Sequence, residues 1–440
     1  MAVKPIKIDA KLVSIGMYIC ELDRPWQSTP FAIHGFYVRD LDEVKKVKVH
    51  CEYVFIDPEK GIVPTEDSTA SRDTIDPAKI VYREKLLPIK INTSAYASVE
   101  PISKEMLPAQ EIYQQLLEEI SLVMDQVKQG SLSSLSRLIE LSQAMVSSFI
   151  RNPDAFLWLV RVCKAGDNPY YYVLRTACWA VLFGRHLGLA KTDLSALALA
   201  LLVKDIGVLK LSDEMRTAFA KHKKENTVDH HIGREVLKNT LSLLRPLSHI
   251  HPKVIKIIKM HGERINGSGF PFQLSGDEIF LLAKVAGIAS YYDNVTYLPN
   301  AKCAIAVSES VSQLHQAKGI QFQDDIVVEF IQAIGLYPTG TLVQLASKEV
   351  AVITEQNYQR RLKPKVMVVV DGEKQAVDAL CVLDLFQQDQ QKKAGKSMPK
   401  RDIVKDVVPY EYPIKVTKIR MQYIAMNTKK SFLSSLFKKG

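Results

Sequence analysis

The sequence predicts a mainly α protein, in which a helical bundle follows a small N-terminal α+β domain and precedes a short C-terminal β hairpin. Apolar residues recur with a period of 3.6 from about Pro108 to Leu336, which is typical of helices packed on a core. Before residue 65, short runs rich in β-branched and aromatic residues alternate with turn residues. After Leu336, the runs TLVQLASKEVAVITEQ and PKVMVVVD have the composition of strands.

These patterns divide the 440 residues into six parts. Residues 66–107 are rich in Ser, Thr, Asp, Pro and Lys without a sustained apolar period, so we expect a linker there. The polar stretch QQDQQKKAGKSMPKR predicts local disorder near the C-terminal end. The parts are a small α+β domain (1–65), the linker (66–107), connecting helices (108–150), a helical domain (151–345), terminal strands (346–372) and a basic, partly disordered tail (373–440).

The individual elements follow from local patterns. In the N-terminal part, KLVSIGMYIC, PFAIHGFYV and CEYVFID predict strands, and DLDEVKKVKVHC predicts a short helix. The first long helix, AQEIYQQLLEEISLVMDQVKQG, has apolar residues at Ile112, Leu116, Ile120 and Val123, and Gly130 is its stop signal. The segment KTDLSALALALLVKDIG predicts an apolar helix that ends close to Lys204 and Asp205.

The positive charge is concentrated at the C-terminal end. The formal net charge is +10, and from Arg361 onward there are 17 Lys and Arg against 8 Asp and Glu. The remainder is nearly neutral. A basic tail can favour an anionic partner such as nucleic acid or lipid headgroups, and we expect no nucleic-acid partner here. The final stretch, KKSFLSSLFKKG, places Phe432, Leu433, Leu436 and Phe437 on one helical face between pairs of Lys. This pattern suits a tail that touches a membrane surface, and the alternative is a solvated tail that aids solubility.

The cysteines and the N-terminus predict a cytoplasmic protein. The six Cys are dispersed and form no CxxC pair, which favours a reducing compartment and argues against a Cys-built zinc site. The N-terminus MAVKPIKIDAKLVSIG lacks the long apolar run of a signal peptide. No apolar run reaches the roughly 20 residues that a membrane span needs.

Residues able to ligate a metal ion are spread along the helical domain: Asp205, His230, His231, His261, Glu263 and Asp293. Their spacing alone is equally compatible with surface and capping roles. The stretch from Met260 to Thr296 is more distinctive, because His261 and Glu263 precede a loop made of Gly267, Ser268, Gly269, Phe270 and Pro271. It resembles the signature region of the HD-GYP family, in which HHE is followed by a DGSGYP loop and a helix. The segment GMYICELDRPWQSTPFAIHGF is similar to an uncharacterised domain that often precedes HD-GYP domains.

The resemblance implies an HD-type helical bundle in a bacterial signalling protein. Relatives of this kind hydrolyse cyclic di-GMP as metal-dependent phosphodiesterases, with two or three iron or manganese ions and a bridging water as nucleophile. Of the family's ligand positions, Asp205 and His261 retain the expected residue. A further His position falls on Asp229, and His230 or His231 replaces it only with a shift in register. The degenerate ligand positions are Asn168, Tyr172, Lys204, Gly262 and Ser290.

These replacements predict that the chain has no metal cofactor. A Lys ammonium brings a positive charge and no lone pair to a position where a metal ion needs a ligand. The loop residues, by contrast, preserve the glycines and proline that set its backbone shape. We therefore expect a catalytically degenerate HD-GYP protein with no confident catalytic residue, acting as a regulatory or protein-interaction module in cyclic di-GMP-related signalling.

Two other functions remain open at this stage. The first is a sensor that binds cyclic di-GMP without hydrolysis, with Lys204 contacting a phosphate of the nucleotide. The second is a residual metal-dependent phosphodiesterase acting on cyclic di-GMP. Its rearranged site would draw on Asp205, Asp229, His230, His231, His261 and Asp293.

Overall fold

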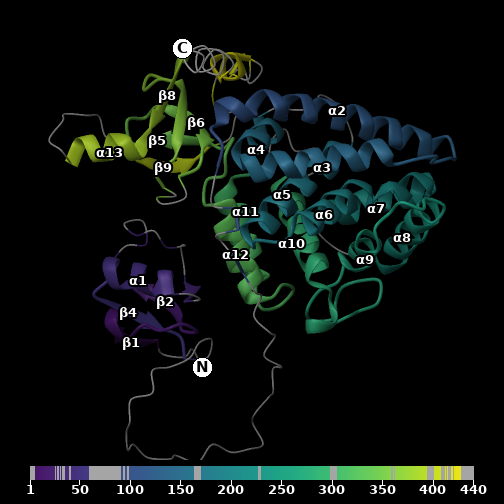
Figure 1. The fold of residues 1–440 in the computed structure, drawn as a ribbon, viewed down its shortest axis with the longest axis horizontal. Coiled ribbons are helices and arrows are strands. Elements are labelled where there is room, and N and C mark those ends of the chain that lie inside the picture. Colours follow the sequence, from purple (N-terminus) through teal and green to yellow (C-terminus); the bar gives the residue numbers. More distant parts are fainter. Residues whose placement is uncertain are drawn as a thin grey trace, which may run out of the picture. The chain divides into compact units, whose positions relative to one another are not determined.

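The chain forms two compact units, Met1–Ile89 and Lys90–Gly440 (Figure 1). Residues 59–90, which include much of the predicted linker, and 428–440, which include the predicted membrane-contacting face, lie outside the described residues. The computed structural model describes residues 5–24, 26, 29, 31, 35–38, 41–58, 91–92, 95–96, 99–162, 170–225, 229–297, 305–357, 360, 362–393, 401–407, 412, 414, 418–419 and 421–427.

The N-terminal unit is an α+β domain, as predicted. Its four strands form an antiparallel sheet in the order β1-β4-β2-β3. Val47 of the helix packs with Ile19, Val54 and Ile56 of the sheet in one apolar cluster. The elements are β1 (Ile6–Asp9), η1 (Ala10–Leu12), β2 (Tyr18–Leu22), β3 (Phe36–Tyr37), α1 (Leu41–His50) and β4 (Tyr53–Ile56).

The second unit contains the predicted helical bundle. Its helices are α2 (Ile102–Lys128), α3 (Ser136–Arg151), α4 (Pro153–Val162), α5 (Tyr171–His186), α6 (Lys191–Val203), η4 (Ile206–Lys210), α7 (Asp213–Glu225), α8 (His230–Leu244), α9 (Pro252–Met260), η5 (Gly276–Glu278), α10 (Leu281–Thr296), α11 (Val307–Gln316) and α12 (Asp324–Ile334). Helix α6 is buried along nearly its whole length after Leu194, which explains its almost uninterrupted apolar sequence. Helix α5 packs against α6, α10 and α12 and so lies at the centre of the bundle.

The predicted connecting helices are part of this bundle. Helix α2 begins at Ile102, within the predicted linker, and ends before Gly130, whose positive φ of 97° explains why the helix stops there. Figure 1 shows α2 and α3 side by side, and α3 also packs against α6. The sequence pattern identified the helices correctly and placed the boundary of the bundle too late.

The predicted C-terminal hairpin is wrong in extent, because the structure has a five-stranded antiparallel sheet there. Its strand order is β8-β7-β6-β5-β9, so strands β8 and β9 come from the predicted tail. Their polar and charged residues, such as Asp378 and Lys405, hid the strand pattern inside a basic stretch. The elements are β5 (Leu342–Leu345), β6 (Val350–Glu355), β7 (Lys365–Val370), β8 (Ala376–Asp384), α13 (Leu385–Lys393) and β9 (Ile403–Asp406).

A late part of the predicted tail also packs on the bundle. Residues 421–427 are helical, and the Tyr423 side chain is 2% exposed. Its ring lies 4.6 Å from the ring of Trp158 in α4, between ring centroids. The predicted tail therefore contains described residues that pack on the bundle. Within the residues that the structure describes, none of the helices combines the length and apolar character required to span a membrane.

Asp154 joins α4 to the C-terminal sheet and gives the fold a pH dependence. Its carboxylate, 4% exposed, accepts hydrogen bonds from the Thr339 hydroxyl at 2.5 Å and from the Gln356 backbone N–H at 3.1 Å. Burial raises the pKa of Asp154 to about 6. The unfolded chain has the ordinary Asp pKa of about 3.9, so the folded chain binds more protons between these values. Asp154 therefore adds to the free energy of unfolding below about pH 4, and this stabilising contribution is lost as the pH rises to about 6.

We expect Asp154→Asn to remove this contribution, which the shift puts at about 2–3 kcal/mol between pH 4 and pH 7. Urea unfolding of the wild type and the variant across this range measures it. The difference between the two free energies of unfolding should change with pH, most steeply between about pH 4 and about pH 6. A constant difference across the whole range would contradict the assignment.

Candidate functional site

The turn after α6 places Lys204 and Asp205 inside the bundle. A Cβ atom on Gly207 would lie 2.2 Å from the carbonyl oxygen of Val236, so only Gly allows α8 to approach this turn. The Thr240 hydroxyl accepts a hydrogen bond from the Gly207 N–H at 3.0 Å and donates one to the Lys204 carbonyl at 3.2 Å. The backbone is thereby fixed, and the side chains of Lys204 and Asp205 are only 7% and 6% exposed.

Lys204 and Asp205 form a buried ion pair. The distance from Lys204 Nζ to Asp205 Oδ2 is 2.5 Å. The same ammonium lies 5.9 Å from the centre of the Tyr172 ring on α5. Burial and the neighbouring Asp205 carboxylate raise the pKa of Tyr172 well above its ordinary value, so this phenol stays neutral. Three of the sequence-predicted positions, 172, 204 and 205, are thus brought together.

His261 ends α9 beside this ion pair. Its Nδ1 lies 2.9 Å from the Ile258 carbonyl oxygen, which can only accept, so Nδ1 carries the proton and Nε2 has the free lone pair. Burial, and after it the positive charge of Lys204, lowers the pKa of His261 to about 4. His261 is therefore a neutral imidazole at physiological pH. It joins Tyr172, Lys204 and Asp205 as the fourth predicted residue of one cluster.

The ring of Phe270 fills the space beside His261. A Cβ atom on Gly262 would lie 2.5 Å from this ring, and one on Gly233 would lie 2.7 Å from it. The ring is therefore held between the two glycines, one after α9 and one in α8. The centroids of the His261 and Phe270 rings are 6.5 Å apart. At the degenerate position 262, the room that a His side chain would need is occupied by the signature loop itself.

Glu263 holds the signature loop in place. Its buried carboxylate accepts hydrogen bonds from the backbone N–H groups of Phe272, at 2.8 Å, and Leu274, at 3.1 Å. Gly269 approaches so closely that a Cβ there would meet the backbone of Glu263 at 2.4 Å. The structure thus uses Glu263, a candidate metal ligand in the sequence, to anchor the loop.

We expect Glu263→Ala to loosen this loop without unfolding the bundle. The variant leaves two backbone N–H groups without their carboxylate, which costs about 1–3 kcal/mol for each group that stays buried. Hydrogen exchange followed by mass spectrometry should show faster exchange in residues 266–275 and unchanged exchange in α5 and α6. Glu278→Ala, which removes a capping contact to Ser275 in the exposed part of the loop, is the matched control. Equal effects of the two variants would contradict the role of Glu263.

Asp293 on α10 is neutralised by a residue that the sequence analysis missed. Arg175 on α5 donates from Nε to Asp293 Oδ1 and from Nη2 to Oδ2, both at 2.9 Å. The Arg175 guanidinium also lies 3.9 Å from the centre of the Tyr297 ring. Arg175 follows Tyr172 by three residues, so helical spacing puts it on the same face as a predicted ligand position. That spacing was the signal in the sequence that could have identified it.

The other predicted residues lie apart from this cluster or have local roles. Asp229 caps α8, since its Oδ1 accepts from the backbone N–H groups of His231 and Ile232 at 2.9 and 3.0 Å. The hydrogen bond from the Ile232 N–H lowers the pKa of Asp229 most, and the bond from the His231 N–H lowers it as well. His231 is exposed, and His230 is partly buried. Among the described residues, neither His230 Nδ1 nor Ser290 Oγ has a hydrogen-bond partner.

Asn168 lies outside the described residues, so only four of the five degenerate positions can be placed.

The residues in place do not fit the family's metal ions. A metal ion binds carboxylate oxygen at about 2.0–2.2 Å, and the Lys204 ammonium already occupies nearly that position on Asp205. Both oxygens of Asp293 are taken by Arg175. Within the described part of the chain, no three His, Cys, Asp or Glu side chains are grouped so that they could hold a metal ion.

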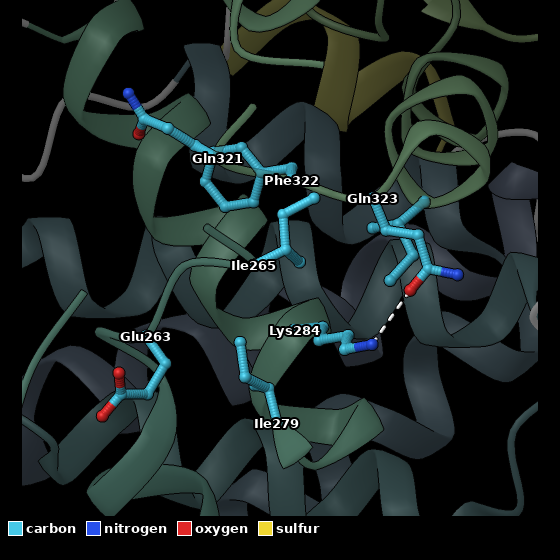
Figure 2. A pocket seen from close by; sticks show the side chains of 8 residues that line it. Glu263, Ile265, Ile279, Lys284, Gln321, Phe322 and Gln323 are labelled. Atoms are coloured by element: carbon cyan, nitrogen blue, oxygen red, sulfur yellow. Dashed lines mark hydrogen bonds between the residues drawn. The ribbon is translucent and has the colours of Figure 1, made fainter. Parts of the chain in front are cut away.

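A small pocket is lined in part by Glu263 and Ile265, which precede the signature loop, and Figure 2 shows its lining. The Lys284 ammonium donates to the Gln323 amide oxygen at 2.9 Å, and the Glu263 carboxylate points away from Lys284 (Figure 2). The cavity volume is about 10 Å³, room for about one water molecule, so a dinucleotide does not fit in this pocket. The other lining residues are Ile265, Ile279, Gln321, Phe322 and Ile326.

Comparisons with known proteins agree with this architecture. Residues 5–137 match a domain of unknown function, DUF3391, and residues 133–325 match the HD domain family. The chain is 23% identical to the cyclic di-GMP phosphodiesterase PA4108 of Pseudomonas aeruginosa over 383 residues, which cover 86% of this chain and 88% of that protein. It is 24% identical to the cyclic di-GMP phosphodiesterase response regulator RpfG of Xanthomonas campestris over 206 residues, 45% of this chain and 53% of the relative.

A solved structure, that of the HDGYP protein Bd1817 from Bdellovibrio bacteriovorus, is 15% identical and covers 74% of this chain and 98% of its own, with a TM-score of 0.38. The DUF3391 match extends beyond the first compact unit into α2 and the start of α3, so the family boundary and the structural boundary differ. The two family matches overlap at residues 133–137 and together cover residues 5–325. The chain therefore has a match to DUF3391 followed by a match to the HD domain family, and it is similar to a cyclic di-GMP phosphodiesterase over most of its length.

Proposed function

We propose that this chain is a catalytically degenerate HD-GYP protein that acts as a regulatory or protein-interaction module in cyclic di-GMP-related signalling. The observation that carries the proposal is the Lys204–Asp205 ion pair, which puts an ammonium where the family's site needs a metal-binding imidazole. The signature loop keeps a fixed shape, anchored by Glu263 and by the seated Phe270 ring. A signature loop that keeps its shape although the metal ligands are lost suits binding better than catalysis.

The alternative of a nucleotide sensor receives less support from the contacts of Lys204. In a sensor, the ammonium would donate to a phosphate, as predicted from the sequence. Its Nζ instead donates to Asp205 at 2.5 Å, and the side chain is only 7% exposed. A phosphate would have to displace a carboxylate that is itself buried, which leaves an uncompensated charge. Cyclic di-GMP remains the ligand to test first, because the two curated relatives are named as cyclic di-GMP phosphodiesterases.

The residual phosphodiesterase has the weakest support. Asp229 caps a helix and His231 is exposed, so they do not add donors to the cluster around His261. Lys204→Ala or Lys204→His alone should not create turnover, since the other altered positions remain. The proposal further includes action in the cytoplasm, which rests on the dispersed cysteines, and a protein partner in the signalling pathway.

The experiment is an assay of cyclic di-GMP turnover and binding by the full chain. Purified protein is incubated with Mn²⁺ or, without oxygen, Fe²⁺, and the products are separated by chromatography, with the Pseudomonas aeruginosa relative as the positive control. We expect no turnover above the metal-only blank. Isothermal titration calorimetry with cyclic di-GMP then separates the remaining functions: micromolar binding favours the sensor, and no binding favours the protein-interaction module. Turnover comparable to that of the relative would refute both functions without catalysis, the interaction module and the sensor.

A further inference from the structure

We propose that the exposed face of α8 is a docking surface for a partner protein, and that it binds an acidic segment of that partner. This surface, the α8 basic stripe, consists of Arg234, Lys238 and Arg245. The inference rests on the proposed function, because a protein-interaction module needs a surface for its partner. It adds where the partner binds and which charge the partner brings.

The region around α8 is strongly basic, although the chain before residue 361 is nearly neutral as a whole. Between Lys204 and Arg264 there are 13 Lys and Arg against 7 Asp and Glu. From Val236 to Gly262 there are 5 Lys and Arg and no Asp or Glu. Helix α8 lies at one end of the bundle, beside α7 and α9 (Figure 1). A local excess of positive charge at a surface attracts acidic partners.

Helical spacing brings the three cations onto one face of α8. Lys238 follows Arg234 by four residues, and Arg245 follows Lys238 by seven, so the side chains lie above one another. Arg245 is the C-cap and retains helical backbone angles, with φ −54° and ψ −39°. All three residues are exposed, and at about 1.5 Å per residue the stripe is about 16 Å long. The buried residues of the helix lie on its opposite face: Ile232, Gly233, Val236, Thr240 and Leu244.

Much of this positive charge has no counter-charge within the chain. Among the residues that the structure describes, Arg234 and Arg245 form no ion pair. Lys238 pairs with Glu235 at 3.4 Å, and its side chain is still 74% exposed. Three exposed cations on α2 and α3 differ, because each has an acidic neighbour: Lys104 with Glu100, Lys128 with Asp125, and Arg137 with Glu140. The stripe is therefore available to a carboxylate from another molecule.

The chemistry of the stripe favours carboxylates carried by a protein. A guanidinium binds a carboxylate through two parallel hydrogen bonds, and two of the three cations are Arg. Leu241 is half-buried on the same side of α8, between Lys238 and Arg245, and offers the partner an apolar contact. Helices α8 and α9, which are both fully described, have no exposed aromatic ring for stacking bases and no exposed large apolar side chain for entering a membrane. An acidic protein segment therefore fits the stripe better than a nucleic acid or a lipid surface.

The test measures the binding of two labelled helical peptides to the full-length protein by fluorescence anisotropy. In the first peptide, Glu residues repeat the spacing of the α8 basic stripe. The second has the same composition, with its Glu residues spread around the helix. We expect the first peptide to bind more tightly, and its affinity to fall as salt is added. The triple variant Arg234→Gln/Lys238→Gln/Arg245→Gln should weaken this binding about tenfold, from the loss of three exposed ion pairs.

The matched control is Lys104→Gln/Lys128→Gln/Arg137→Gln, which removes the same charge from positions that already have acidic neighbours. It should change the dissociation constant by less than about twofold, because distant exposed charges are screened. Both triple variants alter only exposed side chains, so both should fold. Equal losses in the two variants would overturn the proposal, since net charge alone would then explain the binding.

Three other results would also overturn it: equal affinity for the two peptides, no binding of either peptide, or tighter binding of a DNA duplex or of phosphatidylcholine vesicles containing phosphatidylserine. Cyclic di-GMP turnover is measured on the same preparation. Turnover would refute the proposed function, whereas the peptide affinities alone decide on the α8 basic stripe.

Discussion

Replacing Arg175 with Met should lower the free energy of unfolding by about 3–5 kcal/mol, one of the two largest effects that we expect of a single substitution in this chain. The reason is Asp293, which is 1% exposed and loses the guanidinium that binds both of its oxygens. Met preserves much of the packing of the Arg stem, so the loss reports mainly the uncompensated charge. Urea unfolding followed by circular dichroism measures it.

Two controls separate this charge effect from general damage. The double variant Arg175→Met/Asp293→Asn should recover a large part of the loss, because neither position is then charged. Arg137→Met removes an exposed partner of Glu140, and it should cost less than about 1 kcal/mol. If the double variant were as unstable as the sum of the two single variants, the ion pair would not be the cause.

Restoring the family's imidazole through Gly262→His should destabilise the domain by more than about 3 kcal/mol, since even one Cβ overpacks this position. That Cβ would stand 2.5 Å from the Phe270 ring, and the ring cannot retreat because Gly233 lies on its other side. The free energy of unfolding from urea titrations gives the loss. Ser268→His, on the exposed surface of the same loop, should have little effect.

The same contact predicts a coupling between the two positions. Phe270→Ala opens the space that an added side chain at 262 needs, so Gly262→Ala should cost much less in the Phe270→Ala background than in the wild type. We expect a coupling energy of about 1–3 kcal/mol from the double-mutant cycle. Additive losses would mean that the ring of Phe270 is free to move away.

The sequence predicted the helical bundle because its apolar period is long and regular, and α6 shows this most clearly. It predicted the α+β domain from three short strand patterns, and the family matches agree with the HD-GYP resemblance. The extent of the C-terminal sheet was wrong, because β8 and β9 have polar residues within a basic stretch and form only by pairing with distant strands.

At the site, the sequence indicated candidate residues and did not show which of them contact one another. The HD-GYP resemblance pointed to Lys204, Asp205 and His261, which the fold brings together from the ends of α6 and α9. The partner of Asp293 was not predictable in this way, because Arg175 is 118 residues away and no local motif joins them. The occupation of the space at Gly262 by Phe270 depends on how closely α8 and the loop approach, which is a tertiary property.

Lys204 stands where the HD-GYP resemblance implies a metal-binding imidazole, so we expect this protein not to hold the family's metal ions. The most direct measurement is the metal content of the full-length protein after reconstitution with excess Fe²⁺ or Mn²⁺ without oxygen and removal of the unbound ions. We predict far less than one ion per chain, because Lys204 and Arg175 already neutralise the buried carboxylates. Two firmly bound ions per chain, the content of a dinuclear hydrolytic site, would contradict the account.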